Sequence, residues 1–295
     1  MALYDLVDDS GNVFRVRRVG SRFFKPSRQD FNEEEFVTHI QSIRSLPTSS
    51  DDVFICSYPK CGTHWVYDIC QMLESKDVAK NPLRIFEFPR EGGFESPVTV
   101  GSHLYPHELP DDILKKKSRL IRVCRNPKDV AVSYYFFIGE NSTNDLFPYK
   151  GNWSDFFQLF IEGRLTYNSY FDYIDIWSAF EQEHPGFVHV VFYEHLHKDP
   201  AREIRRLGKF LGVDPSLLED TVFIEDIVKT CCFQNIKDLK KIKHPGEYRL
   251  FVDRLWRKGE VGDWKNYFTV AQNEAMDRVI QQRLQHHDIS FIYEL

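Results

Sequence analysis

The clearest pattern in the chain is an alternation of short apolar runs with longer segments of helical periodicity. The run Val53–Cys56 is apolar throughout and predicts a short buried strand. Further along, apolar residues recur at the spacing i, i+3, i+4, i+7, at Val66, Ile69, Cys70 and Leu73. This spacing predicts one buried face of a helix. Residues 58–65, Tyr-Pro-Lys-Cys-Gly-Thr-His-Trp, therefore lie between a strand and a helix.

The same alternation continues along the chain. Apolar runs predict three further strands, at residues 98–103, 120–124 and 188–193. After two of them, Asn126-Pro127 and Asp199-Pro200 each combine a helix-capping residue with a proline suited to the first helical position. Strands that alternate with helices predict an α/β fold with a central parallel sheet flanked by helices. We expect one domain over residues 1–295, with residues 1–25 as a peripheral segment tethered by aromatic side chains (Phe14, Phe23 and Phe24, with Phe31 just beyond it).

Functional side chains follow the ends of the predicted strands. Lys60, His103, Arg125 and Tyr193 each lie at or just beyond such an end. Ligands of parallel α/β sheets bind outside the carboxyl ends of the strands. We therefore expect these four residues to converge on one site.

The turn at residues 58–65 has the chemistry of an anion site. A helix start presents free backbone N–H groups and the positive end of the helix dipole. Lys60 adds a positive charge, Thr63 can cap the helix or donate a hydroxyl, and Trp65 offers a stacking surface for a nucleotide base. The turn resembles a P-loop but lacks the G-x-x-x-x-G-K-[ST] spacing, which argues against an ordinary Walker-type ATPase. The alternative is a plain glycine turn before a helix.

Two further cation clusters favour a ligand with at least two anionic groups. Arg125 precedes a predicted helix start, although an ion pair with Asp129 is the simpler interpretation. Near the carboxyl end, Arg257 and Lys258 adjoin Gly259, which lets the backbone approach an anion closely. A single histidine is more often structural than catalytic, but the position of His103 beside the Lys60 turn favours a base.

Composition limits the remaining possibilities. The net charge of −6 gives no overall attraction to nucleic acid or to anionic membranes, and no run approaches the length of a membrane span. The first residues lack the pattern of a secretion signal, and the six cysteines show no zinc-binding spacing, so we expect reduced thiols, a cytoplasmic location and no metal. Two polar stretches, residues 139–152 and 234–248, are the candidates for loops or lids. The second is rich in lysine, and we interpret it as a solvated basic surface.

Taken together, these residues resemble the cytosolic sulfotransferase family from about residue 25 onward. Residues 58–65 resemble the family's 5′-phosphosulfate loop, and residues 125–135 resemble its 3′-phosphate segment. Phe192-Tyr193-Glu194 matches a shorter signature. Residues 257–266, from Arg-Lys-Gly to Gly-Asp-Trp-Lys-Asn, are similar to the family's C-terminal cofactor loop.

The resemblance implies a cofactor and residue roles. The sulfuryl donor would be 3′-phosphoadenosine 5′-phosphosulfate, with adenosine 3′,5′-bisphosphate as product. Its 5′ side and adenine would be held by Lys60, Cys61, Gly62, Thr63, His64, Trp65 and Phe233. Its 3′-phosphate and adenosine would be held by Arg125, Ser133, Tyr193, Arg257, Lys258 and Gly259.

The resemblance also implies a mechanism. An acceptor oxygen would attack sulfur in line, by analogy with phosphoryl transfer. His103 would take the acceptor's proton, Lys60 would stabilise the leaving oxygen, and Ser133 would orient Lys60 by a hydrogen bond. Phe88, Phe137 and Tyr167 would line the pocket for a phenol, catecholamine, steroid or alcohol, although ordinary core packing explains them nearly as well. The family's homodimer motif is matched by Lys265, Thr269, Val270 and Glu274.

The sequence departs from the family pattern in four places. Cys61 stands where serine is usual, His64 where threonine or serine is usual, Gly101 where many members carry lysine, and Cys231-Cys232 where a hydroxylated pair is usual. Two other functions stay open: a P-loop nucleotide kinase, which needs Mg²⁺, and a nucleotide-binding module without catalysis.

Overall fold

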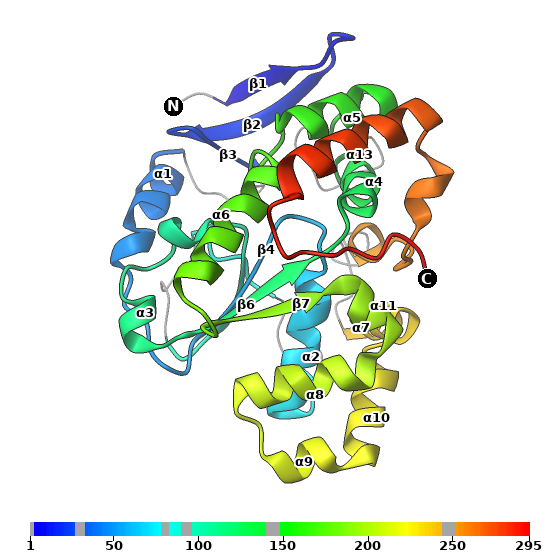
Figure 1. Ribbon diagram of the computed structural model, residues 1–295. Helices are drawn as coiled ribbons and strands as arrows, with labels where there is room; N and C mark the ends of the chain where they lie inside the picture. Colours follow the sequence, from blue (N-terminus) through cyan, green and yellow to red (C-terminus); the bar gives the residue numbers. More distant parts are fainter. Residues whose placement is uncertain (1–2, 27–32, 78–82, 90–95, 140–147, 244–251) are drawn as a thin grey trace.

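A computed structural model of the chain describes residues 3–26, 33–77, 83–89, 96–139, 148–243 and 252–295. Its centre is a four-stranded parallel sheet with the order β5-β4-β6-β7. The strands are β4 (Val53–Ser57), β5 (Thr99–Ser102), β6 (Arg119–Cys124) and β7 (Val188–Phe192). These are the four strands that the apolar runs predict, so the expected α/β fold is confirmed (Figure 1).

Helices surround this sheet, as expected for parallel strands with crossover connections. They are α1 (Glu33–Ser42), α2 (Thr63–Ser75), α3 (Ile113–Lys116), α4 (Pro127–Ile138), α5 (Trp153–Glu162), α6 (Tyr170–Glu183), α7 (Tyr193–Lys198), α8 (Pro200–Leu211), α9 (Pro215–Glu219), α10 (Thr221–Thr230), α11 (Phe233–Lys243) and α13 (Val270–Leu284). Short 3₁₀ turns lie at Ile43–Ser45, Pro106–Glu108 and Asp263–Asn266.

Both predicted proline-initiated helices form. The side chain of Asn126 accepts a hydrogen bond from the Asp129 amide at the start of α4, and Asp199 accepts one from Arg202 at the start of α8. Helix α8 ends at Gly212, which adopts the left-handed conformation with φ 78°. The strand order places β4 between β5 and β6, so the chain reverses direction across the sheet at the carboxyl end of β4. Such a switch point is where α/β sheets bind ligands.

The first residues form a second sheet that the sequence analysis did not predict. Strands β1 (Tyr4–Val7), β2 (Val13–Val19) and β3 (Arg22–Phe24) pair antiparallel in that order. Phe14 and Phe24 are buried and Phe23 packs against the core, in keeping with their expected role as tethers. Phe31 lies outside the described residues. The segment expected to be peripheral therefore packs on the body through one face of a sheet (Figure 1).

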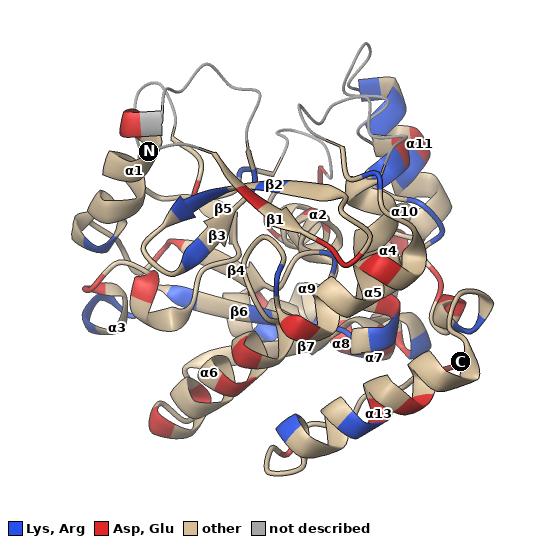
Figure 2. Cartoon of the chain, turned by 90° about the horizontal axis from the view of Figure 1, so that it is seen from above, with Lys and Arg blue, Asp and Glu red and all other residues tan. Residues whose placement is uncertain are grey.

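Residues 234–243 are not a loop. They belong to α11, so the expectation of a loop or lid is wrong for this part, and residues 244–248 lie outside the described residues. Figure 2 shows the lysines of α11 as blue bands. They do not form a purely solvated basic surface, because Lys240 is 2% exposed and its Nζ lies 2.5 Å from a carboxylate oxygen of the fully buried Asp68 on α2. The helical spacing of Ile236 and Lys240 places both on the buried face. For the other lid candidate, residues 140–147 lie outside the described residues.

This buried ion pair leads to a prediction about stability. Lys240→Met should lower the free energy of unfolding by about 3–5 kcal/mol, because removing one partner leaves a buried carboxylate uncompensated. Burial raises the pKa of Asp68 to about 7, and Lys240 lowers it. The carboxyl of the variant therefore protonates more readily, and the loss should be larger at pH 8 than at pH 5. Urea unfolding at both pH values measures this.

The matched control is Lys243→Met on the same helix. Lys243 pairs at 2.7 Å with Asp77, but both side chains are well exposed, at 39% and 44%. Its loss should cost about 1 kcal/mol or less. Equal losses for Lys240→Met and Lys243→Met would contradict the special role given to the buried pair.

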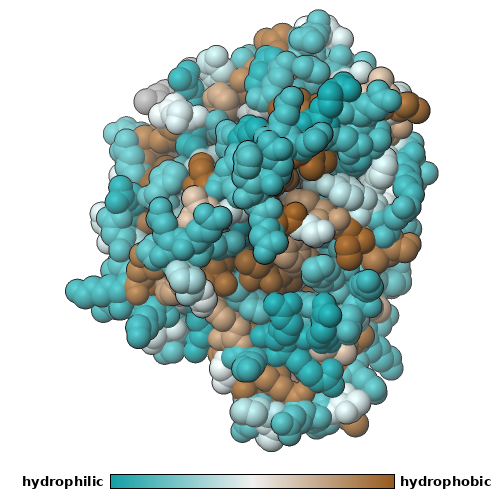
Figure 3. Space-filling model, in the orientation of Figure 1, coloured by the Kyte–Doolittle hydropathy of each residue, from teal (hydrophilic) through white to brown (hydrophobic). Residues whose placement is uncertain are grey.

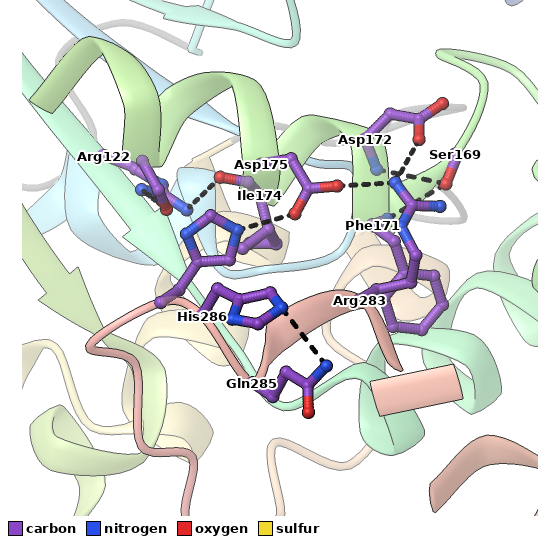
Figure 4. A network of polar contacts seen from close by, with 11 residues as sticks. Arg122, Ser169, Phe171, Asp172, Ile174, Asp175, Arg283, Gln285 and His286 are labelled. Atoms are coloured by element: carbon purple, nitrogen blue, oxygen red, sulfur yellow. Dashed lines mark hydrogen bonds and ion pairs between the residues drawn. The ribbon is translucent and has the colours of Figure 1, made fainter. Parts of the chain in front are cut away.

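The last long helix is held to the body by a polar network. Arg283 of α13 donates hydrogen bonds to Asp172 (2.6 Å) and Asp175 (2.5 Å) of α6, and Nε2 of His287 lies 2.8 Å from Asp175 (Figure 4). Nearby, the fully buried Arg122 of β6 donates to Glu181 on the same α6 at 2.9 Å. Helix α6 therefore carries charged contacts to both the sheet and the C-terminal helix.

One face of the molecule is mixed in character (Figure 3). Figure 3 shows mainly hydrophilic side chains with apolar groups scattered among them. Among the helices that the structure describes, we find none with both the length and the apolar character needed to cross a membrane.

Candidate active site

The turn between β4 and α2 is built around two residues with positive φ. Lys60 has φ 71° and Gly62 has φ 111°, so the chain turns sharply before α2 begins at Thr63. A Cβ on Gly62 would lie 2.9 Å from the ring of Tyr193, in addition to the strain of its φ. Gly62 caps α2 without a side-chain hydrogen bond. Because the first N–H groups of a helix lack intrahelical partners, this end of α2 can receive an anion.

The other residues of the turn are mostly structural in their contacts. The hydroxyl of Thr63 lies 2.5 Å from that of Ser57, and Cys61 is buried, which raises the pKa of its thiol. Burial likewise lowers the pKa of His64 well below its usual value. Trp65 donates from its indole to the carbonyl of Cys231 at 2.7 Å. Trp65 thereby connects α2 to the residues just before Phe233 on α11.

The ammonium group of Lys60 is buried. Its Nζ has no hydrogen-bond partner among the residues that the structure describes, and it lies 4.1 Å from the centre of the Phe137 ring. The expected hydrogen bond to Ser133 on α4 is therefore not formed, because the ammonium faces the aromatic ring instead. Burial, followed by the charges of nearby arginines and Lys25, lowers the pKa of Lys60 well below its usual value. An anion at this position would satisfy the ammonium.

His103 follows β5 and faces the same turn. Its Nδ1 lies 2.7 Å from the carbonyl oxygen of Ser57. Since a carbonyl only accepts, Nδ1 carries the proton and Nε2 is left with a free lone pair. Burial, together with the charges of Lys60 and Arg22, lowers the pKa of His103 to about 4, against one hydrogen bond to Ser57 that raises it. The imidazole is therefore neutral at pH 7 and able to accept a proton.

A buried carboxyl supports the backbone of His103. Glu87 is fully buried and accepts a hydrogen bond from the His103 amide through Oε1. Burial raises the pKa of Glu87 to about 8. With this pKa the carboxyl of Glu87 is mostly protonated at pH 7. It therefore adds little negative charge beside the imidazole and does little to raise the pKa of His103.

Arg125 and Tyr193 come from the ends of β6 and β7 and contact each other. The guanidinium lies 4.1 Å from the centre of the Tyr193 ring and donates to the carbonyls of Lys60 (3.2 Å) and Glu260 (3.0 Å). Arg125 does not pair with Asp129, so the simpler interpretation is wrong. Asp129 is buried and accepts instead from the amides of Gly262 (2.8 Å) and Trp264 (3.0 Å). Arg125 and Asp129 thus hold the C-terminal loop (residues 257–266) close to the Lys60 turn and the start of α4.

The C-terminal loop brings its glycine under an aromatic ring. Gly259 has φ 71°, and any Cβ there would collide with the ring of Phe233 at the start of α11. Arg257 and Lys258 both pair with the buried Asp263. The predicted cations thus lie together, with part of their charge balanced by one carboxylate.

The three aromatic residues predicted for the acceptor pocket each pack against an aromatic or charged side chain. Tyr167 packs its ring 4.7 Å from that of His103, and Phe137 covers Lys60. Phe88 packs on Phe36 of α1, at 6.2 Å between ring centres. Phe24 links the two groups, since it contacts both Tyr167 and Phe36. An aromatic wall therefore runs from His103 to Phe88.

The glycine near the proposed base has a packing explanation. A Cβ on Gly101 would lie 3.0 Å from Ile85 and 3.1 Å from Leu83. A lysine at this position would need these side chains to move. The glycine that replaces the family's usual lysine at position 101 therefore lies where the edge of the sheet is tightly packed.

Sequence reasoning missed the part that several residues play in shaping this site. Glu87, Asp129 and Asp263 each organise the backbone or the cations around the predicted residues. A charged residue between two aromatic ones, as in Phe86-Glu87-Phe88, was the one local signal for a buried carboxyl. Arg22, from the N-terminal sheet, had no such signal.

Comparison with known proteins now gives the family. The sequence model described as "Sulfotransferase domain" matches residues 90–288. Human sulfotransferase 1C2 is 30% identical over 98% of this chain and 99% of its own length, and dog sulfotransferase 1B1 is 32% identical over 88% and 92%. The chain belongs to the sulfotransferase family, and it is a sulfotransferase enzyme.

Solved structures agree with this fold. The crystal structure of mouse sulfotransferase SULT7A1 complexed with PAP has a TM-score of 0.76 and 27% identity, covering 92% of this chain and 96% of its own. A retinol dehydratase in complex with androsterone and inactive cofactor PAP has a TM-score of 0.71 at 17% identity, over 98% and 92%. At that identity the second likeness concerns the fold alone.

Proposed function

We propose that this enzyme transfers the sulfuryl group of 3′-phosphoadenosine 5′-phosphosulfate to a hydroxyl or amine of a small acceptor. The observation that carries the proposal is the buried ammonium of Lys60, which has no hydrogen-bond partner in the described chain and lies at a helix start beside His103. An uncompensated buried charge costs stability, so a fold that keeps one uses it to bind an anion. Adenosine bisphosphate in the mouse SULT7A1 structure supports the same donor here.

The chain offers two separate places for the donor's charges. The Lys60 turn, with Cys61, Gly62, Thr63 and His64, would hold the 5′ side. Arg125, Ser133, Arg257, Lys258 and the backbone of Gly259 would hold the 3′-phosphate. Trp65, Tyr193 and Phe233 would enclose the adenosine, since Trp65 already contacts Tyr193 at 5.2 Å between ring centres. Arg257 and Lys258 both pair with Asp263. A phosphate bound there would therefore compete with this carboxylate for the two cations.

His103 and Lys60 have different roles in the proposed reaction. When bound, the donor supplies an activated sulfuryl group. Nε2 of His103 takes the acceptor's proton as the acceptor oxygen becomes nucleophilic. Lys60 and the start of α2 stabilise negative charge that develops on the leaving phosphate oxygen. The chain's own residues thus supply both a proton acceptor for the acceptor hydroxyl and a positive charge for the leaving oxygen.

The acceptor is proposed to be a small aromatic or polycyclic alcohol. The wall from Tyr167 to Phe88 offers flat apolar contacts next to the base. Phenols lose their proton more easily than aliphatic alcohols, because their pKa is about 10.

Binding experiments separate this proposal from its two rivals. Calorimetry should show tight binding of adenosine 3′,5′-bisphosphate, and much weaker binding of AMP, which lacks the 3′-phosphate. A nucleotide kinase would instead bind ATP in a Mg²⁺-dependent manner and turn it over. Binding of the bisphosphate without transfer to any acceptor would favour a module without catalysis.

We propose that the protein forms a homodimer through Lys265, Thr269, Val270 and Glu274. Thr269 caps α13, and Val270, the first residue of that helix, is apolar and 77% exposed. Its exposure leaves the start of α13 accessible to a second copy of the chain. The relationship to cytosolic sulfotransferases also supports a cytoplasmic location and a single domain over residues 1–295.

A single charge tests the dimer. Val270→Glu should convert a dimer into a monomer in sedimentation experiments, because it places two like charges across a symmetric contact. Val222→Glu is the control, since Val222 on α10 is 75% exposed but outside the motif. A dimer that survives Val270→Glu would refute the assigned interface.

A further inference from the structure

A buried arginine from the N-terminal sheet reaches the back of the active site. Arg22 on β3 is 8% exposed. It donates from Nη1 to the carbonyl of Tyr167 at 3.0 Å and from Nη2 to the carbonyl of His103 at 3.4 Å. One guanidinium therefore joins the residue proposed as base to the tyrosine that packs on its ring.

The guanidinium is itself held firmly. Its Nε forms an ion pair with Glu108 at 2.9 Å that lacks the geometry of a hydrogen bond, and its Cζ lies 3.7 Å from the centre of the Tyr105 ring. Glu108 in turn accepts from the Tyr105 amide at 2.7 Å. These contacts hold the guanidinium in place. The carbonyls of Tyr167 and His103 are therefore bonded to a group that has little freedom to move.

We propose that Arg22 is a positioning residue, which fixes the imidazole of His103 and the ring of Tyr167 relative to each other and to the acceptor. This inference rests on the proposed function of His103. Donation from two different nitrogens to two separate carbonyls uses the planar fork of arginine, which lysine lacks. The N-terminal sheet thereby becomes part of the catalytic framework.

Arg22 also contributes to the electrostatics of the base. The polar and charged groups that face His103 come from several other parts of the fold, and they are Ser57, Lys60, His64, Glu87, Tyr167 and Arg22. Among the charges, Lys60 and Arg22 both lower the pKa of His103. Loss of the Arg22 charge should therefore raise that pKa.

Two variants separate position from charge. Arg22→Gln removes both the fork and the charge, whereas Arg22→Lys keeps the charge and removes the fork. The control is Arg18→Gln on β2, because Arg18 is exposed and donates to the carbonyl of Gly20 at 3.0 Å. For each variant we would titrate the His103 imidazole by NMR in the unliganded protein, and measure kcat, KM and thermal melting.

We expect kcat to fall on the order of 10- to 100-fold in both Arg22 variants, since small misplacements near reacting groups have effects of this size. The KM for the donor should not change. The pKa of His103 should rise in Arg22→Gln and stay near the wild-type value in Arg22→Lys. Arg18→Gln should behave as the wild type in every measurement.

A purely structural role would lower the melting temperature and leave kcat and the His103 titration unchanged, and that result would overturn the inference. If Arg22→Gln does not fold, Arg22→Lys decides, because wild-type kcat in the folded lysine variant contradicts the need for the fork. A wild-type enzyme that transfers no sulfuryl group would contradict the proposed function. The NMR titration of the unliganded protein would still decide whether Arg22 acts on His103.

Discussion

His103→Gln should lower the rate of sulfuryl transfer on the order of 10²–10⁴-fold and leave the affinity for adenosine 3′,5′-bisphosphate unchanged. Glutamine can still donate to the carbonyl of Ser57, which His103 contacts at 2.7 Å, so the local backbone should keep its course. It cannot accept a proton from the acceptor. The loss should therefore appear in kcat, measured by transfer of labelled sulfuryl groups with saturating donor.

The pH profile gives the same residue a second test. Because the pKa of His103 is lowered to about 4, its Nε2 stays unprotonated from neutral pH down to mildly acidic pH. The wild-type rate should fall only as pH approaches that value, with no step near the ordinary histidine pKa of ~6.5.

The control for His103→Gln is His107→Gln. His107 is exposed and lies four positions beyond His103, in the short turn after β5. We expect it to retain wild-type transfer and the wild-type pH profile. A His103→Gln enzyme that keeps its turnover would remove His103 from the mechanism.

Lys60→Met should lower transfer on the order of 10²–10³-fold and at the same time stabilise the fold. The ammonium of Lys60 has no hydrogen-bond partner within the described part of the chain, and a buried donor left unsatisfied costs roughly 1–3 kcal/mol. Methionine has a similar shape and can pack on Phe137, which lies 4.1 Å from the ammonium. The free energy of unfolding should therefore rise as activity is lost.

The pH dependence of this gain follows from the direction of the pKa shift. The folded protein lowers the pKa of Lys60, so between the folded value and about 10.5 the unfolded chain binds more protons. Wild-type stability thus increases with pH in that window as far as Lys60 contributes. The advantage of Lys60→Met should be largest below the window and disappear toward pH 10.5.

Lys117→Met is a matched control, because Lys117 also has positive φ, at 58°, but its side chain is exposed. It should change neither transfer nor stability by much. If Lys60→Met unfolds more easily than the wild type, the ammonium contributes to the fold, and its assignment as a functional charge held at a cost fails.

Local patterns in the sequence predicted the parts of the site that depend on neighbouring residues. The strand before Lys60, the helix after it and the cap at Asn126 are each encoded within a few positions. Once the parallel order was inferred, the convergence of Lys60, His103, Arg125 and Tyr193 followed from the rule for strand ends. Their roles as phosphate ligands came from family resemblance, and they stay predictions.

Other features depend on contacts between distant segments. The hydrogen bond from Arg22 to His103 joins residues 81 positions apart, and the one from Lys240 to Asp68 joins residues 172 apart. No periodicity marks such pairs. The N-terminal sheet had a detectable signal, since the buried Phe14 and Val16 alternate with less buried positions. The arginines between and after them made this apolar face hard to recognise in the sequence. In α11 one of the buried positions is a lysine, so the apolar residues alone did not show the helical spacing.

The most direct test of the whole account is transfer of a labelled sulfuryl group from 3′-phosphoadenosine 5′-phosphosulfate, without added metal, to a panel of phenols, catecholamines, steroids and aliphatic alcohols. We predict turnover on at least one acceptor, strongest among the aromatic alcohols, and its loss in His103→Gln. Failure to bind either the donor or adenosine 3′,5′-bisphosphate would contradict the account at its centre, because the Lys60 turn would then have another purpose.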